Sequence, residues 1–154
     1  MSTVLVFGVF DGIHPGHLAF LRQAKRLGDT LVVSVARDTV VEQEKGQRPR
    51  IAEGDRRRLV ASLRIVDRAV LGDPPNRYTQ IFRRIRPTVV AIGYDQHCAP
   101  EVFRAQLAAM RLPNTKIIRL RPYRGTSYHT SQLRTCLHGF SPRDRQPRKA
   151  AGAQ

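Results

Sequence analysis

The chain has 154 residues, the length of one domain that buries its own core, so we expect no second catalytic domain. Its 27 Lys and Arg residues outnumber 12 Asp and Glu residues, and the formal net charge is +15. A surface of this charge attracts anions. It suits nucleic acid, an anionic membrane or phosphate-bearing small molecules equally well, so charge alone does not choose the partner.

The cysteines and the N-terminal segment indicate a cellular setting. Two cysteines, Cys98 and Cys136, are too few for a disulfide framework or a four-ligand zinc site, which favours a reducing compartment. The N-terminal segment MSTVLVFGVFDG has neither the basic stretch of a signal peptide nor the roughly 20 apolar residues of a membrane span. We therefore expect a cytoplasmic protein with no membrane partner.

Five short apolar runs predict strands. Three of them, Val4–Phe7, Leu31–Ala36 and Val89–Ile92, are rich in β-branched residues and almost continuously apolar. Two weaker runs, Ala69–Leu71 and Lys116–Leu120, predict two more strands. Continuous apolar strands are typical of a parallel sheet that is buried on both faces.

Helices are predicted between these strands. The first begins at Pro15, which suits a first helical position, and ends at Gly28. Others are predicted at Asp55–Leu63, Tyr78–Ile85 and Glu101–Met110. This alternation predicts an α/β fold, a doubly wound Rossmann-like parallel sheet of about five strands with helices on both faces. Ligands bind such sheets beyond the carboxyl ends of the strands.

The C-terminal segment differs in composition from the rest of the chain. From residue 138 onward the sequence HGFSPRDRQPRKAAGAQ has no apolar periodicity and is rich in Pro, Gly and Arg. Such a segment buries too little apolar surface to fold. We interpret residues 1–137 as the folded domain and residues 138–154 as a basic, disordered tail.

The first predicted strand continues into GVFDGIHPGH, which places His14 and His17 three residues apart at the start of a helix. Both rings can then face one ligand, and the helix N-terminus adds backbone N–H groups and a dipole equivalent to about half a positive charge. This arrangement favours phosphate. Two alternatives stay open: His14 is a helix N-cap with His17 a packed or exposed helix residue, or the pair binds a metal without a nearby third ligand.

The segment Gly8–His17 matches the pattern G-[TSNV]-F-D-x-x-H-x-G-H and resembles the HxGH cytidylyltransferases and adenylyltransferases. Val9 stands where Thr or Ser is commoner, which removes a hydroxyl and leaves the backbone N–H. The resemblance continues through VARD, KGQRPRIAEGDRRRLVASLRIVDRAVLGD and GYDQ, and covers nearly all of residues 3–137. Within the family the sequence most resembles archaeal-type FAD synthases, which transfer AMP from ATP to FMN. It next resembles glycerol-3-phosphate cytidylyltransferase.

The resemblance implies a nucleotide site. In the family the histidines contact the triphosphate, and a late Arg followed by a Ser/Thr pair binds the leaving phosphates. The late segment here is RGTSYHTSQL, in which His129 stands where the family usually has Ser. The nucleotide-binding residues implied are Val9, Phe10, His14, His17, Gly93, Asp95, Arg124, Thr130 and Ser131. Thr130 and Ser131 equally suit an ordinary helix cap.

The resemblance also implies an acceptor site around the KGQRP segment. Lys45 and Arg48 would reach the acceptor phosphate or the transferred phosphoryl group. The acceptor-binding residues implied are Asp11, Asp38, Lys45, Arg48 and Arg56, and the catalytic residues are His14, His17, Lys45 and Arg124. Asp38 and Asp95 equally suit capping the helices that follow them, and Arg57 and Arg58 are interpreted as a solvated helix face.

The implied reaction is an in-line attack of the acceptor phosphate on the α-phosphorus of a nucleoside triphosphate, with release of pyrophosphate. A divalent cation, Mg²⁺ or another, accompanies the triphosphate, and no residue is assigned as its protein ligand. Because related enzymes are often dimers, the resemblance also implies a possible homodimer. One alternative is an enzyme that uses CTP and glycerol 3-phosphate. Another alternative is a non-catalytic nucleic-acid-binding protein. The low aromatic content of 6% and the lack of an RNA-binding signature do not favour it. We therefore expect nucleic acid to be an incidental partner.

Overall fold

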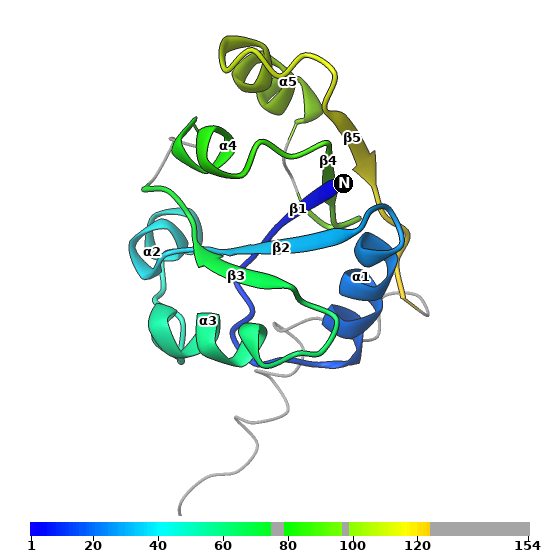
Figure 1. Cartoon of the computed structure of the whole chain (residues 1–154). Coiled ribbons are helices and arrows are strands. Elements are labelled where there is room, and N and C mark those ends of the chain that lie inside the picture. The colour runs from blue at the N-terminus through cyan, green and yellow to red at the C-terminus, as the bar shows by residue number, and fades with distance from the viewer. Residues whose placement is uncertain (75–78, 97–98, 124–154) are drawn as a thin grey trace, which may run out of the picture.

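The computed structural model describes residues 1–74, 79–96 and 99–123 of the chain. Its centre is a five-stranded parallel sheet with the order β3-β2-β1-β4-β5 (Figure 1). The strands are β1 (Thr3–Gly8), β2 (Thr30–Val35), β3 (Arg68–Leu71), β4 (Val89–Ile92) and β5 (Lys116–Arg119). The helices are α1 (Pro15–Lys25), α2 (Asp38–Lys45), α3 (Glu53–Ala61), α4 (Thr79–Ile85) and α5 (Pro100–Ala109). The predicted parallel α/β fold is confirmed.

The central strands β1, β2 and β4 bury both of their faces, as their continuous apolar sequences require. On one face the side chains of Val4 and Val6 pack with Leu21 of α1 and Val60 of α3. On the other face Leu5 belongs to a second cluster, whose helical members come from α4 and α5: Ile81, Phe82, Phe103 and Leu107. Helices therefore cover the two faces in pairs, as Figure 1 shows.

The central strand β1 marks the place where the strand order reverses. It pairs with β2 from Thr3↔Thr30 to Gly8↔Val35, and on its other side with β4 from Val4↔Val89 to Val6↔Ala91. The chain winds outward through β2 and β3 on one side and through β4 and β5 on the other. Loops that follow β1 and β4 therefore leave neighbouring strand ends toward opposite faces, the usual position of a ligand site in such sheets.

Helix α2 begins at Asp38, where the sequence offers a helix cap as one alternative but gives no helical range. It has eight residues, and Val41 is the residue that the helix buries. A single buried position gives no apolar stripe, so periodicity could not reveal the helix. The predicted start of α4 at Tyr78 and the tail at residues 138–154 lie outside the described residues.

None of the described helices is long and apolar enough to cross a membrane.

The turn after β1 has an unusual backbone. Phe10 has a φ of 54°, in the left-handed region that residues other than glycine seldom adopt, and Gly12 has a φ of 93°. The Gly12 N–H donates to the Phe10 carbonyl at 3.0 Å. The Phe10 ring is 2% exposed and lies over Gly8, where a Cβ would come within 2.5 Å of it. Gly8 is therefore required by the close approach of this ring.

We predict that Gly8→Ala lowers the free energy of unfolding by about 1–3 kcal/mol, the usual cost of overpacking a core, because the buried Phe10 ring must move. Equilibrium urea denaturation measures the change. Gly54→Ala in α3 is the matched control, since a Cβ there meets nothing within 4 Å. Helix propensity predicts that the control gains up to about 1 kcal/mol. Equal effects of the two substitutions would contradict the packing explanation.

Candidate active site

The residues that the sequence singles out gather at the carboxyl edge of the sheet. The 9–14 loop follows β1, residues 36 and 37 follow β2, and residues 93–96 follow β4. The 46–52 loop, between α2 and α3, also reaches this edge, because it is hydrogen-bonded to the 9–14 loop. The site is thus built from four segments: strand pairing brings three of them to one edge, and hydrogen bonds add the fourth.

His14 and His17 lie against each other at the start of α1. Their ring centroids are 3.8 Å apart and the rings are inclined by 28°. His14 is the N-cap residue with an extended backbone, but its side chain makes no capping hydrogen bond. The Phe10 ring lies 5.0 Å from His17 and completes the packing. The predicted approach of the two imidazoles at the helix N-terminus is therefore present in the structure.

Burial makes the His17 imidazole a neutral group. The pKa of His17 is lowered to about 3, chiefly by desolvation and also by the nearby His14, while a backbone hydrogen bond with Gly12 acts in the opposite direction. Its Nδ1 is buried without a hydrogen-bond partner among the described residues. A neutral imidazole can donate one N–H to an oxygen of an anion. The pair therefore presents hydrogen-bond donors at the positive end of α1 without stacking one cation on another.

Residues 93–96 are fixed to the sheet by two side chains. Gln96 accepts from the Gly93 N–H at 3.0 Å, and its Nε2 donates to the Phe7 carbonyl at 2.7 Å. Arg119 of β5 donates from Nη1 to the carbonyls of Gly93 and Gln96, both at 3.0 Å. Asp95 is exposed between these anchors, at the same edge as the histidines. Sequence reasoning missed both Gln96 and Arg119, although Gln96 belongs to the quoted GYDQ motif.

Two predicted acceptor residues are exposed near the 46–52 loop. Lys45 is the last residue of α2, and Arg48 lies in the loop that follows. The Nε of Arg48 pairs with the Glu42 carboxylate at 2.8 Å. The hydrogen bond to Glu42 raises the pKa of Arg48, and the charge of that carboxylate acts in the same direction. Both basic groups are accessible to a ligand from solvent.

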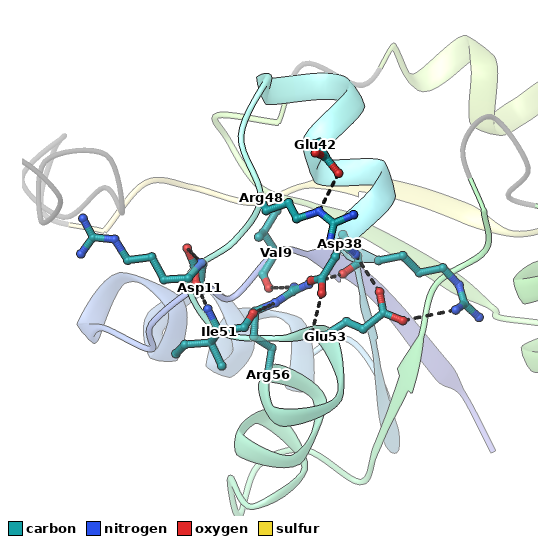
Figure 2. A network of polar contacts seen from close by, with 11 residues as sticks. Val9, Asp11, Asp38, Glu42, Arg48, Ile51, Glu53 and Arg56 are labelled. Carbon is teal, nitrogen blue, oxygen red and sulfur yellow. Dashed lines mark hydrogen bonds and ion pairs between the residues drawn. The ribbon is translucent and has the colours of Figure 1, made fainter.

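The prediction that Arg56 contacts the acceptor is corrected by the structure. The Arg56 side chain is 0% exposed, and its guanidinium donates to protein oxygens of Val9, Ala36, Asp38 and Ile51 (Figure 2). A side chain with no exposed surface does not contact a ligand. Arg56 instead connects the segments that form the site.

Asp11 and Asp38 are also engaged by the protein. Asp11 is 9% exposed and accepts from the backbone N–H groups of Arg50 and Ile51, each at 3.0 Å. Asp38 pairs with Arg56 at 2.6 Å and accepts from the Glu53 N–H at 3.3 Å. The Asp38 N–H in turn donates to the Glu53 carboxylate at 2.7 Å. The first turns of α2 and α3 therefore cap each other.

Several predicted residues contribute less directly or lie outside the described structure. The Phe10 ring is buried, and the Val9 carbonyl accepts from Arg56. The late residues of the predicted site, Arg124, His129, Thr130 and Ser131, lie outside the described residues. Within residues 1–74, 79–96 and 99–123, no three His, Cys, Asp or Glu side chains are grouped to bind a metal ion.

Comparison with known proteins identifies the family. The family model described as cytidylyltransferase-like matches residues 5–136. The chain belongs to the cytidylyltransferase-like family. It is a nucleotidyltransferase, as the HPGH motif predicted.

Relatives and solved structures extend the comparison. The FAD synthase of Ferroglobus placidus is 43% identical over 121 residues, which are 79% of this chain and 77% of that protein. The FAD synthase of Aciduliprofundum boonei is 42% identical over 123 residues, 80% of each chain. The lipopolysaccharide core biosynthesis protein of Thermoplasma volcanium has a TM-score of 0.74 and 34% identity, over 80% of this chain and 98% of that one. Pantothenate synthetase of Thermus thermophilus shares the fold, with a TM-score of 0.54 and 19% identity over 78% of this chain and 55% of that one.

We predict that His17 makes folding sensitive to acid. Its pKa in the folded chain, about 3, lies below the ordinary value of 6.5, so the unfolded chain binds the proton more readily. The stability contributed by the neutral ring is therefore present above pH 6.5 and is lost as the pH falls from 6.5 toward 3. His17→Gln should lose less unfolding free energy across this window than the wild type, in urea titrations at each pH. Parallel pH profiles would contradict the lowered pKa.

Proposed function

We propose that this nucleotidyltransferase transfers AMP from ATP to FMN, which gives FAD and pyrophosphate. The observation that carries the proposal is the stacked His14–His17 pair, in which His17 is neutral, at the N-terminus of α1 and at the sheet edge where the strand order reverses. Relatives of about 40% identity that are named FAD synthase support the choice of acceptor. The basic groups on the other side of the site, Lys45 and Arg48, suit the phosphate of FMN.

The proposed reaction needs no covalent intermediate. An oxygen of the FMN phosphate attacks the α-phosphorus of ATP, a new P–O bond forms, and the bond to the β-phosphate oxygen breaks in line with it. His14 and His17 donate hydrogen bonds to the phosphate oxygens as negative charge moves toward the leaving group. Arg124, Thr130 and Ser131 bind the departing pyrophosphate in this proposal, by their resemblance to the family motif.

The nucleoside and its cation occupy the other strand ends in this proposal. Gly93 and Asp95 follow β4, which pairs with β1, and they face the ribose or base, while Val9 and Phe10 contribute their backbone. Mg²⁺ enters as part of the substrate, bound to the triphosphate oxygens. Such ions keep several waters and need only one or two protein carboxylates, and Asp95 is an exposed carboxylate at this edge.

A second candidate within the same enzyme class uses CTP and glycerol 3-phosphate, and the family description, cytidylyltransferase-like, favours CTP as the nucleotide. Nucleic-acid binding is proposed as incidental, because a protein of charge +15 attracts any polyanion. A cytoplasmic location, a homodimer and the division into a nucleotidyltransferase domain at residues 1–137 and a basic tail at residues 138–154 remain proposals.

The decisive experiment is a matrix of ATP, CTP, GTP and UTP against FMN, glycerol 3-phosphate and sugar 1-phosphates, with pyrophosphate release as the readout. We expect release with ATP and FMN, and loss of that release when EDTA removes the divalent cation. Activity with CTP and glycerol 3-phosphate instead would replace the proposed substrates. No release with any pair, together with tight salt-resistant binding of nucleic acid, would favour the non-catalytic alternative.

We predict that His17→Ala lowers kcat by about 10²–10³-fold, the usual effect of removing one donor to a transition-state oxygen. The substitution also removes a buried group, so circular dichroism and urea denaturation must show that the variant folds. Arg22→Ala is the matched control, because Arg22 is exposed on the same helix. Near-normal turnover by a folded His17→Ala protein would exclude the proposed role of the imidazole.

A further inference from the structure

The 46–52 loop and the 9–14 loop are joined by a closed set of hydrogen bonds (Figure 2). Arg56 Nε donates to the Ile51 carbonyl at 2.8 Å, and Nη1 of the same guanidinium donates to the Val9 carbonyl. The Ile51 N–H donates to Asp11 at 3.0 Å. Val9 and Asp11 are two residues apart in one loop, so the circuit begins and ends in the 9–14 loop. Both peptide groups that flank Ile51 are therefore fixed relative to His14.

The guanidinium also fixes this circuit to the sheet. Its Nη2 donates to the Ala36 carbonyl, just after β2, at 2.8 Å and to Asp38 at 2.6 Å. The mutual capping of Asp38 and Glu53 holds the starts of α2 and α3 side by side. The 46–52 loop is thus joined at Arg50 and Ile51 to the 9–14 loop that follows β1, and through Arg56 to Ala36, which follows β2.

Burial makes this arrangement cooperative. A guanidinium that is 0% exposed cannot exchange a lost partner for water, so each missing acceptor leaves a buried donor unsatisfied. Its planar fork supplies several donors in fixed directions, whereas a lysine ammonium is a single point charge. The buried charge of Arg56 is therefore satisfied only when the 9–14 loop, residues 36–38 and the 46–52 loop are all in place. This requirement fixes the position of the 46–52 loop.

We propose that Arg56 and Asp11 are positioning residues, which set the distance between the acceptor and the triphosphate. The proposal rests on the proposed function, in which the 46–52 loop and the adjoining Lys45 bind the acceptor phosphate and the 9–14 loop binds ATP. Neither residue contacts substrate in this role. Because a misplacement of about 1 Å can lower a rate by about 10²-fold, the circuit aligns the attacking oxygen with the α-phosphorus.

The test uses two conservative substitutions in the full chain. Asp11→Asn keeps the shape of the side chain but offers one oxygen acceptor where the carboxylate offers two to Arg50 and Ile51. Arg56→Lys keeps the charge that pairs with Asp38 but cannot span the same acceptors. Asp55→Asn and Arg58→Lys are matched controls on α3, because that pair is exposed and joined at 3.1 Å.

We expect each of the two test variants to raise KM for FMN and to lower kcat by about 10-fold to 10²-fold, while calorimetric affinity for ATP without FMN stays within about twofold. The controls should match the wild type. The double variant Asp11→Asn/Arg56→Lys should be no slower than the more severe single variant, because both break one circuit.

Three results would overturn the proposal: unchanged FMN kinetics, an equal loss of ATP affinity, or additive effects in the double variant. If Arg56→Lys does not fold, Asp11→Asn decides, since it retains the guanidinium. Failure of the proposed function is a separate result, because the wild type itself would then not transfer AMP to FMN. The same kinetic measurements on the variants would then be made with the acceptor that the substrate matrix identifies.

Discussion

The reversal of strand order beside β1 is the constraint on which the rest of the molecule depends. Because β2 and β3 extend the sheet on one side and β4 and β5 on the other, the helices divide into α1 and α3 on one face and α4 and α5 on the opposite face. The chain after β1 and the chain after β4 then depart in different directions from adjacent strand ends. The histidine loop and residues 93–96 are neighbours for this reason, although they are about eighty positions apart in the sequence.

Burial, which stabilises the sheet, also determines the chemistry of the edge. The packing of Phe10 over Gly8 shapes the 9–14 loop and places an aromatic ring against His17. In this environment the imidazole does not retain a proton at neutral pH. Neutral donors bind a phosphate oxygen less strongly than charged ones, by roughly a factor of two. Such a site can stabilise charge that develops during transfer and still release a highly charged product.

The sequence was sufficient for the parts of the structure that depend on local pattern. Three continuous β-branched runs and two weaker apolar runs located the five strands, and the HPGH motif located the edge where the histidines meet. Helix α2 gave no apolar stripe, and the role of Arg56 could not be read from pattern. Arg56 resembles its neighbours Arg57 and Arg58 in the sequence, and it differs from them because Val9, 47 positions away, and Ala36, 20 positions away, come within reach only in the folded chain. Contacts of that separation carry no local signal.

The net charge of +15 comes mainly from residues around the site and not from the groups within it. Arg56 is buried and is bonded to three backbone carbonyls and to Asp38, Arg48 forms an ion pair with Glu42, and His17 is uncharged. The exposed cations act through a field that is screened over about 8 Å at physiological ionic strength, so they concentrate phosphates near the surface without choosing among them. Choice requires groups held at fixed distances from one another. In the proposed site those distances follow from one buried guanidinium and one carboxylate, which bind the two loops through backbone groups and leave the exposed side chains to contact the substrates.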